Sequence, residues 1–97
     1  MFKNNKKAKY KFAEIKKKKY YFYKITWVDI TGDSGHATEH EFLGMKASVM
    51  VTHAYVFKKD KKHILTFASY EQNDELFSDR NIFPIGCVIK MEKILLW

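Results

Sequence analysis

The residues from Tyr20 to Thr31 constrain the fold of this chain more than any other segment. Their sequence, YYFYKITWVDIT, consists almost wholly of aromatic and β-branched residues, which favour extended backbone over a helix. The following Gly32-Asp-Ser-Gly35 contains two glycines around residues that hydrogen-bond their own backbone, a combination typical of turns. The sequence therefore predicts a long β-strand at residues 20–31 and a turn at residues 32–35.

A short helix is predicted after this turn. Thr38 is followed three residues later by Glu41, which fits a capping box at the start of a helix. Phe42 and Met45 then provide a small apolar face, and Gly44 limits the length of the helix. We therefore expect one or two helical turns after Thr38.

The remaining segments predict further strands. Residues 49–57 and 63–70 are rich in strand-forming types and are joined by the polar residues 58–62, so they predict a hairpin with a cationic tip. Residues 81–95 predict two short strands broken near Pro84 and Gly86, a bend of the kind that closes small barrels. The expected fold is mainly β: a small five-stranded antiparallel barrel, SH3-like or Sm-like, with one short helix. An OB-type barrel is the alternative, because strand counts do not separate the two.

The charge of the chain is concentrated in its first quarter. The net charge is +7, but ten lysines against Glu14 give residues 1–24 a charge of +9, whereas residues 25–97 carry −2. The four adjacent lysines at residues 16–19 repel one another and favour a solvated segment. We therefore expect residues 1–19 to form a partly disordered basic N-terminal arm and residues 20–97 to form the barrel domain.

Lysines interleaved with aromatic residues are the ingredients of a surface that binds single-stranded nucleic acid, because lysines neutralise phosphates and rings stack on bases. Tyr10, Phe12 and residues 20–23 supply such rings beside the arm, and exposed members of the set Trp27, Tyr55 and Tyr70 could add to them. A flexible solubilising extension is the alternative interpretation of the arm. The residues predicted to bind nucleic acid or a partner are Lys6, Lys7, Lys9, Lys11, Lys16, Lys17, Lys18, Lys19, Tyr20, Lys58, Lys59, Lys61 and Lys62.

Two short motifs match catalytic signatures but are expected to be loops. Gly32-Asp-Ser-Gly35 matches the tetrapeptide around the nucleophile of trypsin-like proteases, yet no histidine precedes it. His36, Glu39 and His40 form the H-x-x-E-H pattern of a zinc protease, but the capping box places His36 before the helix. We expect no catalytic residue, no metal and no cofactor, and keep a metal-dependent hydrolase built on these three residues as a remote alternative.

The compartment is predicted from what the sequence lacks. Its one cysteine, Cys87, cannot form an intramolecular disulfide and is expected to be a small buried hydrophobic residue. No apolar run approaches the roughly 18–20 residues that span a bilayer, and the N-terminal lysines do not lead into the apolar core of a signal peptide. We therefore expect a cytoplasmic protein without a membrane partner.

Residues 20–95 resemble a group of small proteins encoded by tailed bacteriophages. The resemblance rests on the strand from Tyr23 to Ile30, the Gly32-Asp-Ser-Gly-His36 turn, the acidic helix from Glu39 to Met45, the hairpin around Tyr55 and Tyr70, and the closing segment from Ile82 to Ile89. It implies a β-barrel accessory protein of the host cytoplasm without known catalysis, and it transfers no active-site residue.

From the residues and the resemblance together we expect a non-enzymatic, phage-encoded binding module whose basic arm attracts a polyanion. The alternative is an inhibitor or decoy that binds a host enzyme or defence protein through the barrel. A homo-oligomer formed through exposed sheet edges is also plausible for such a fold.

Overall fold

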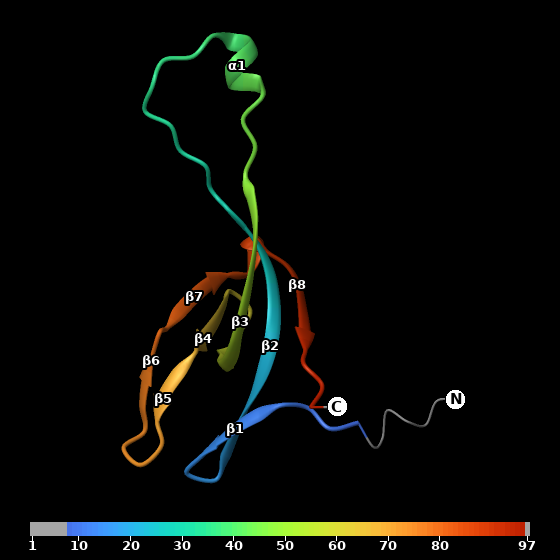
Figure 1. Cartoon of the computed structure of the whole chain (residues 1–97), viewed down its shortest axis with the longest axis vertical. Helices are drawn as coiled ribbons and strands as arrows, with labels where there is room; N and C mark the ends of the chain where they lie inside the picture. Colours follow the sequence, from blue (N-terminus) through green and yellow to red (C-terminus); the bar gives the residue numbers. More distant parts are fainter. Residues whose placement is uncertain (1–7, 97) are drawn as a thin grey trace, which may run out of the picture.

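The structure is a computed structural model that describes residues 8–96 as a mainly β, antiparallel fold (Figure 1). The main sheet has the strand order β1-β2-β3-β4-β7, strand β8 pairs with β2, and β5 pairs with β6 in a separate two-stranded sheet. The elements are β1 (Phe12–Ile15), β2 (Lys18–Asp29), α1 (Glu39–Leu43), β3 (Ser48–Lys59), β4 (His63–Phe67), β5 (Ser69–Glu71), β6 (Leu76–Ser78), β7 (Asn81–Pro84), a 3-10 helix (Ile85–Cys87) and β8 (Val88–Lys93). The prediction of a mainly β fold is confirmed.

Strand β2 corresponds to the long strand predicted from the aromatic and β-branched run. It pairs with β3 from Phe22–Tyr55 to Asp29–Ser48, and its other edge pairs with β1 and β8. Core clusters cover part of each face of β2, which explains why this segment is rich in aromatic and β-branched residues.

The hydrophobic core consists of two small clusters on opposite faces of the sheet. Tyr20 and Ile25 lie an odd number of residues apart in β2, so their side chains leave the strand on opposite sides. Ile64 and Phe67 are divided in the same way in β4. The buried members are Ile15, Tyr20 and Phe67 in the first cluster and Ile25, Ile64 and Phe83 in the second.

The described part of the predicted arm belongs to the sheet. Strand β1 pairs with the first residues of β2 through a tight turn at Lys16 and Lys17, which have φ angles of 49° and 69°. Ala13 and Ile15 are 4% and 2% exposed. Burial of these two residues orders the segment, while alternation along the strands directs neighbouring lysines to opposite faces and reduces their repulsion.

The boundary expected at residue 19 therefore falls inside the β1–β2 hairpin, and residues 8–19 are not a free extension. The remainder of the predicted arm, residues 1–7, lies outside the described residues.

Helix α1 follows Thr38, as the capping box predicts. The Thr38 hydroxyl accepts a hydrogen bond from the Glu41 N–H at 3.1 Å, and the Glu41 carboxylate accepts one from the Thr38 N–H at 2.9 Å. The helix ends at Leu43 and is followed by the C-cap Gly44, whose N–H donates to the Glu41 carbonyl at 3.1 Å. It stands at the end of a long extension beyond the β2–β3 ribbon, which Figure 1 shows at the top of the molecule. We call residues 29–51 the finger.

The sheet is not closed into the predicted barrel. The chain does bend near Pro84 and Gly86, where the 3-10 helix separates β7 from β8. However, β8 returns to β2, and among the described residues β7 pairs only with β4. Closure would require β7 to pair with the opposite edge of the sheet, but that edge consists of the two short strands β1 and β8, which offer no continuous partner.

Candidate nucleic-acid interface

Three segments that are distant in sequence meet at Phe22 in β2. The Phe22 N–H donates to the Lys11 carbonyl, the Ile94 N–H donates to the Phe22 carbonyl, and the Lys11 N–H donates to the Ile94 carbonyl, each at 2.9 Å. Strands β1 and β8 thus occupy successive halves of the same edge of β2. This junction brings side chains of β1, β2 and β8 onto one surface.

A row of aromatic rings and lysines covers one face of this junction. The Phe12 and Tyr21 rings meet edge to face with centroids 5.8 Å apart, and the Lys19 ammonium lies 4.8 Å from the Phe12 ring centroid. The Lys93 ammonium lies 4.4 Å from the Tyr21 ring and 5.0 Å from the Tyr10 ring. We call this set the lysine–aromatic surface: Tyr10, Phe12, Lys19, Tyr21, Tyr23 and Lys93.

Register explains why these side chains share a face. Tyr21 and Tyr23 alternate with the inward-facing Tyr20, and Tyr23 is paired with Lys93 while Tyr21 is paired with Phe12. Phe12 is 40% exposed and the three tyrosines are half-buried, so part of each side chain is accessible to solvent. Ammonium groups held near rings by cation–π attraction are placed beside flat apolar surfaces, the arrangement that phosphates and stacked bases require.

Tyr20, which was predicted to bind nucleic acid, is part of the core. It is 7% exposed, and its ring contacts Phe57, Phe67 and Phe77 with centroids 5.4–5.8 Å apart. A base could stack on it only if the sheet opened. Tyr21 and Tyr23 lie on the other face of β2, where both are half-buried, and Tyr23 also packs against the second core cluster, so Tyr21 is the tyrosine of β2 better placed for stacking.

The predicted lysines of the β1–β2 region divide between both faces and the turn. Lys19 belongs to the lysine–aromatic surface, whereas Lys18 lies 5.5 Å from the Tyr20 ring and Lys11 lies 4.3 Å from the Phe22 ring, both on the opposite face. Lys17 lies in the turn, and Lys16 beside it forms an ion pair of 2.8 Å with Glu75. The Lys9 carbonyl accepts a hydrogen bond from the Leu96 N–H, and Lys6 and Lys7 lie outside the described residues.

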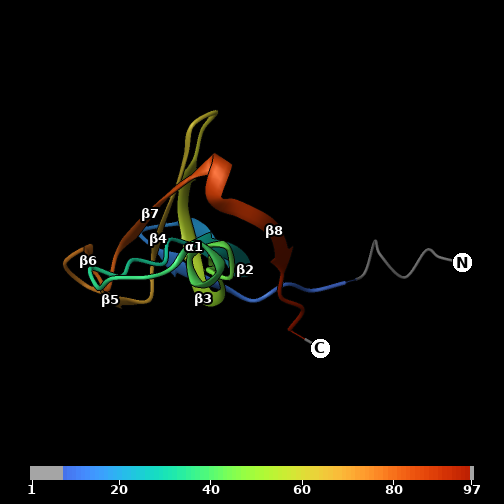
Figure 2. The same ribbon diagram turned by 90° about the horizontal axis from the view of Figure 1, so that it is seen from above.

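The remaining predicted lysines, Lys58, Lys59, Lys61 and Lys62, form the tip of the β3–β4 hairpin and do not join the lysine–aromatic surface. Figure 2 shows the tip of this hairpin projecting beyond the rest of the sheet at the top of the view. The Lys62 carbonyl accepts a hydrogen bond from the Ile85 N–H at 2.8 Å, which ties the tip to the 3-10 helix.

Asp60 orders this tip. Its carboxylate accepts hydrogen bonds from the N–H groups of Lys62 at 2.8 Å and His63 at 2.7 Å, and these bonds lower the pKa of Asp60 below its ordinary value. Because the folded pKa is the lower one, the stabilisation is present above the ordinary pKa and is lost as the pH falls through the lowered value.

The other expected aromatic contacts are directed inward. Trp27 donates from its indole N–H to the Thr52 hydroxyl at 2.9 Å and packs against the second core cluster. Tyr55 and Tyr70 pack against the first cluster. These three rings therefore support the sheet and are not part of the lysine–aromatic surface.

The motifs with catalytic resemblance lie in the finger. The Asp33 carboxylate accepts a hydrogen bond from the Gly35 N–H at 2.8 Å, and the chain bends at Gly35 within the segment predicted as a turn. His36 precedes α1, so it does not share a helical face with His40. Within residues 8–96, no group of three or more histidine, cysteine or acidic side chains is placed to hold a metal ion. Cys87 is half-buried in the 3-10 helix, not fully buried in a strand.

Sequence reasoning missed Lys93, which contacts three rings of the lysine–aromatic surface. No local signal identifies it, because its position depends on the pairing of Tyr23 with a strand seventy residues further along the chain.

Comparison of the chain with protein families, curated proteins and solved structures found no significant match. No helix in the described part of the chain is long and apolar enough to cross a membrane.

Proposed function

We propose that this protein is a non-enzymatic binding module that binds single-stranded nucleic acid through the lysine–aromatic surface. The observation that carries the proposal is the position of Lys93, whose ammonium group lies 4.4 Å from the Tyr21 ring and 5.0 Å from the Tyr10 ring. An ammonium group beside half-exposed rings can neutralise a phosphate while an adjacent base stacks on a ring. Such contacts do not distinguish bases, so we expect binding with little sequence preference.

Charge supports this assignment. The finger contains four carboxylates and one lysine and therefore has a net charge of −3, so the rest of the chain has a net charge of +10. The net charge of −2 for residues 25–97 is thus due to the finger, and the sheet itself is basic. A basic sheet attracts polyanions at long range and adds a salt-dependent term to the affinity.

The strand path also supports a relationship to SH3-like barrels. Strands β2, β3, β4 and β7 follow one another in the sheet, and the last strand, β8, returns to the first. We propose an open variant of that architecture, and the resemblance to bacteriophage proteins implies an accessory role in the host cytoplasm.

A titration with a fluorescein-labelled oligothymidine of roughly 20 nucleotides tests the function. Fluorescence anisotropy is measured at about 50 mM and about 200 mM NaCl, and wild-type binding is expected to weaken steeply with salt. Tyr21→Leu keeps an apolar side chain but removes the stacking face, and should weaken binding by about 1–3 kcal/mol. Lys93→Gln should reduce the slope of log affinity against log salt by about 0.7.

Lys46→Gln is the matched control, because it removes one positive charge from the finger and should leave the salt slope unchanged. Binding that is absent, or independent of salt, would exclude the nucleic-acid function. Equal effects of Lys93→Gln and Lys46→Gln would show that the lysine–aromatic surface has no special part in binding.

The alternative function, an inhibitor or decoy of a host protein, draws support from the edge of β7 that pairs with no described strand, to which an extended segment of another protein could add. A protein acting in this way would keep its activity in the Tyr21→Leu, Lys93→Gln double variant. Deleting the basic segment is a poorer test, because it would remove β1 and the buried residues Ala13 and Ile15.

A further inference from the structure

The finger is entirely exposed, although it is rich in apolar residues. Every residue from 29 to 51 is solvent-exposed. Single exposed apolar residues are common on protein surfaces, but a dense group of them marks an interaction site. The exposed large apolar side chains of the finger are Ile30, Phe42, Leu43, Met45, Val49, Met50 and Val51.

Local polar bonds hold the finger in shape without burying these side chains. The capping box fixes the start of α1, the Asp33 carboxylate fixes the turn before it, and the Thr31 and Ser48 hydroxyls meet at 3.5 Å across the base. A helix of five residues has little stability of its own, and α1 has no buried residue. The finger is thus a projection held by a few local hydrogen bonds, and its apolar side chains are not buried by the described part of the chain.

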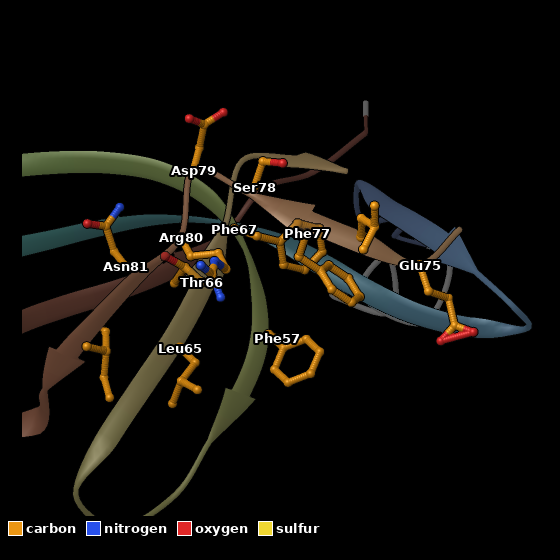
Figure 3. A pocket seen from close by; sticks show the side chains of 12 residues that line it. Phe57, Leu65, Thr66, Phe67, Glu75, Phe77, Ser78, Asp79, Arg80 and Asn81 are labelled. Carbon is orange, nitrogen blue, oxygen red and sulfur yellow. The ribbon is translucent and has the colours of Figure 1, made fainter. Parts of the chain in front are cut away.

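A groove that could receive such side chains lies elsewhere on the molecule. It has a volume of about 950 Å³ and is formed by β3, β4, β6 and β7 (Figure 3). Leu76 and Ile82 on its walls are each 59% exposed. Its lining includes Phe57, Leu65, Leu76, Phe77, Ile82 and Arg80.

The groove offers one cation, Arg80, to the carboxylates of the finger, while Glu75 and Asp79 also lie in its lining. The two acidic residues of its lining have partners, because Glu75 pairs with Lys16 and Asp79 accepts a hydrogen bond from the Ser69 hydroxyl at 2.7 Å. Arg80, in contrast, forms no ion pair with any described residue. The finger carries −3, with Glu39 and Glu41 in α1 next to Phe42 and Leu43.

We propose that the occupant of the groove is a second copy of this chain, and that two copies form a two-fold dimer in which each finger lies in the groove of the other. The apolar side chains of α1 would pack on the apolar walls, and a carboxylate of α1 would pair with Arg80. The arrangement is isologous, so it closes at two copies and leaves no finger unpaired. It uses different strands from the lysine–aromatic surface and does not depend on the proposed nucleic-acid function.

Sedimentation equilibrium of the full chain tests the dimer, which should have twice the chain mass of 11.6 kDa. Phe42→Ser with Leu43→Ser alters the finger, and Arg80→Glu with Ile82→Ser alters the groove. Each double variant should raise the dimer dissociation constant at least about tenfold, which equals about 1.4 kcal/mol. Ile89→Ser, which changes an apolar residue of β8 that is 58% exposed, is the matched control and should leave the dimer intact.

Mixing the two double variants separates this arrangement from other dimers. The finger variant keeps an intact groove, and the groove variant keeps an intact finger. A heterodimer of the two therefore has one fully intact finger–groove contact and should form more tightly than either variant associates with itself. A wild-type protein that is monomeric at high micromolar concentration would overturn the proposal. It would also be overturned if only the finger variant lost dimerisation, because the fingers would then contact each other and not the groove.

Discussion

Tyr20 and Tyr21 are neighbours in β2 that face different environments. Tyr20 is 7% exposed and lies in a cluster of rings, whereas Tyr21 is half-buried beside Lys93. The difference arises from the alternation of the strand, which directs consecutive side chains to opposite faces. A sequence of four consecutive aromatic residues does not show which pair faces inward, because that depends on the pairing with β1 and β3.

The most sensitive single residue should be Phe67, which is 1% exposed and contacts Tyr20, Tyr55, Tyr70 and Phe77. Phe67→Ala removes a ring from a packed cluster and should lower the free energy of unfolding by about 3–5 kcal/mol. Urea denaturation followed by far-ultraviolet circular dichroism measures the change. Tyr21→Leu is the control and should cost less than about 1.5 kcal/mol, and comparable losses in the two variants would contradict the assignment of Phe67 to the core.

At the scale of elements, the sequence predicted what depends on local chemistry. The long strand, the capped helix and the 58–62 hairpin tip follow from β-branched runs, from Thr38 with Glu41, and from a short polar connector. Strand β1 was missed because it has only four residues, between Lys11 and Lys16, and the burial of its Ala13 and Ile15 depends on contacts with distant strands. The open sheet and the position of Lys93 are likewise long-range properties, which local patterns do not specify.

Helix α1 provides a test of how far the finger is independent of the sheet. Thr38→Ala removes the capping hydroxyl and should shift the backbone chemical shifts of residues 39–43 toward random-coil values. The melting temperature should change little, because no residue of α1 is buried. Nuclear magnetic resonance and thermal denaturation measure both effects on the Arg80→Glu, Ile82→Ser background, in which the proposed dimer is weakened. A large fall in melting temperature would mean that the finger supports the sheet.

The same cap should respond to pH. The hydrogen bonds that the Glu41 carboxylate forms with Thr38 lower the pKa of Glu41 below its ordinary value. Stabilisation of the helix start is therefore present above the ordinary pKa of a glutamate and is lost as the pH falls through the lowered value. In the wild-type cap, the chemical shifts of residues 39–43 should move toward random-coil values across that acidic range, whereas Thr38→Ala should show a weaker response.

At the scale of the whole molecule, two separate clusters stabilise one sheet. They share the strands β2 and β4, but their buried side chains lie on opposite faces. Shared strands should make unfolding a single cooperative transition, while the absence of common side-chain partners should make the energetic effects independent.

Ile15→Val in the first cluster and Ile25→Val in the second test this expectation. Each should cost about 0.5–1.5 kcal/mol, and the double variant should show the sum of both within about 0.5 kcal/mol. Denaturant titration gives the free energy of unfolding of each variant. Coincidence of the transitions followed by tyrosine and tryptophan fluorescence and by circular dichroism shows whether unfolding is cooperative. Two separate transitions would show that the two clusters do not unfold cooperatively. A strongly non-additive double variant would show that their contributions to stability are not independent.

The shared edge of β2 has a consequence for the order in which the chain can fold. Tyr10 bridges to Leu95, and β8 completes the edge that β1 begins. Pairing across such a long sequence separation closes a large loop and slows folding. During synthesis, half of that edge stays without a partner until residues 88–93 leave the ribosome, so the nascent chain exposes an unpaired strand edge at which neighbouring nascent chains could associate.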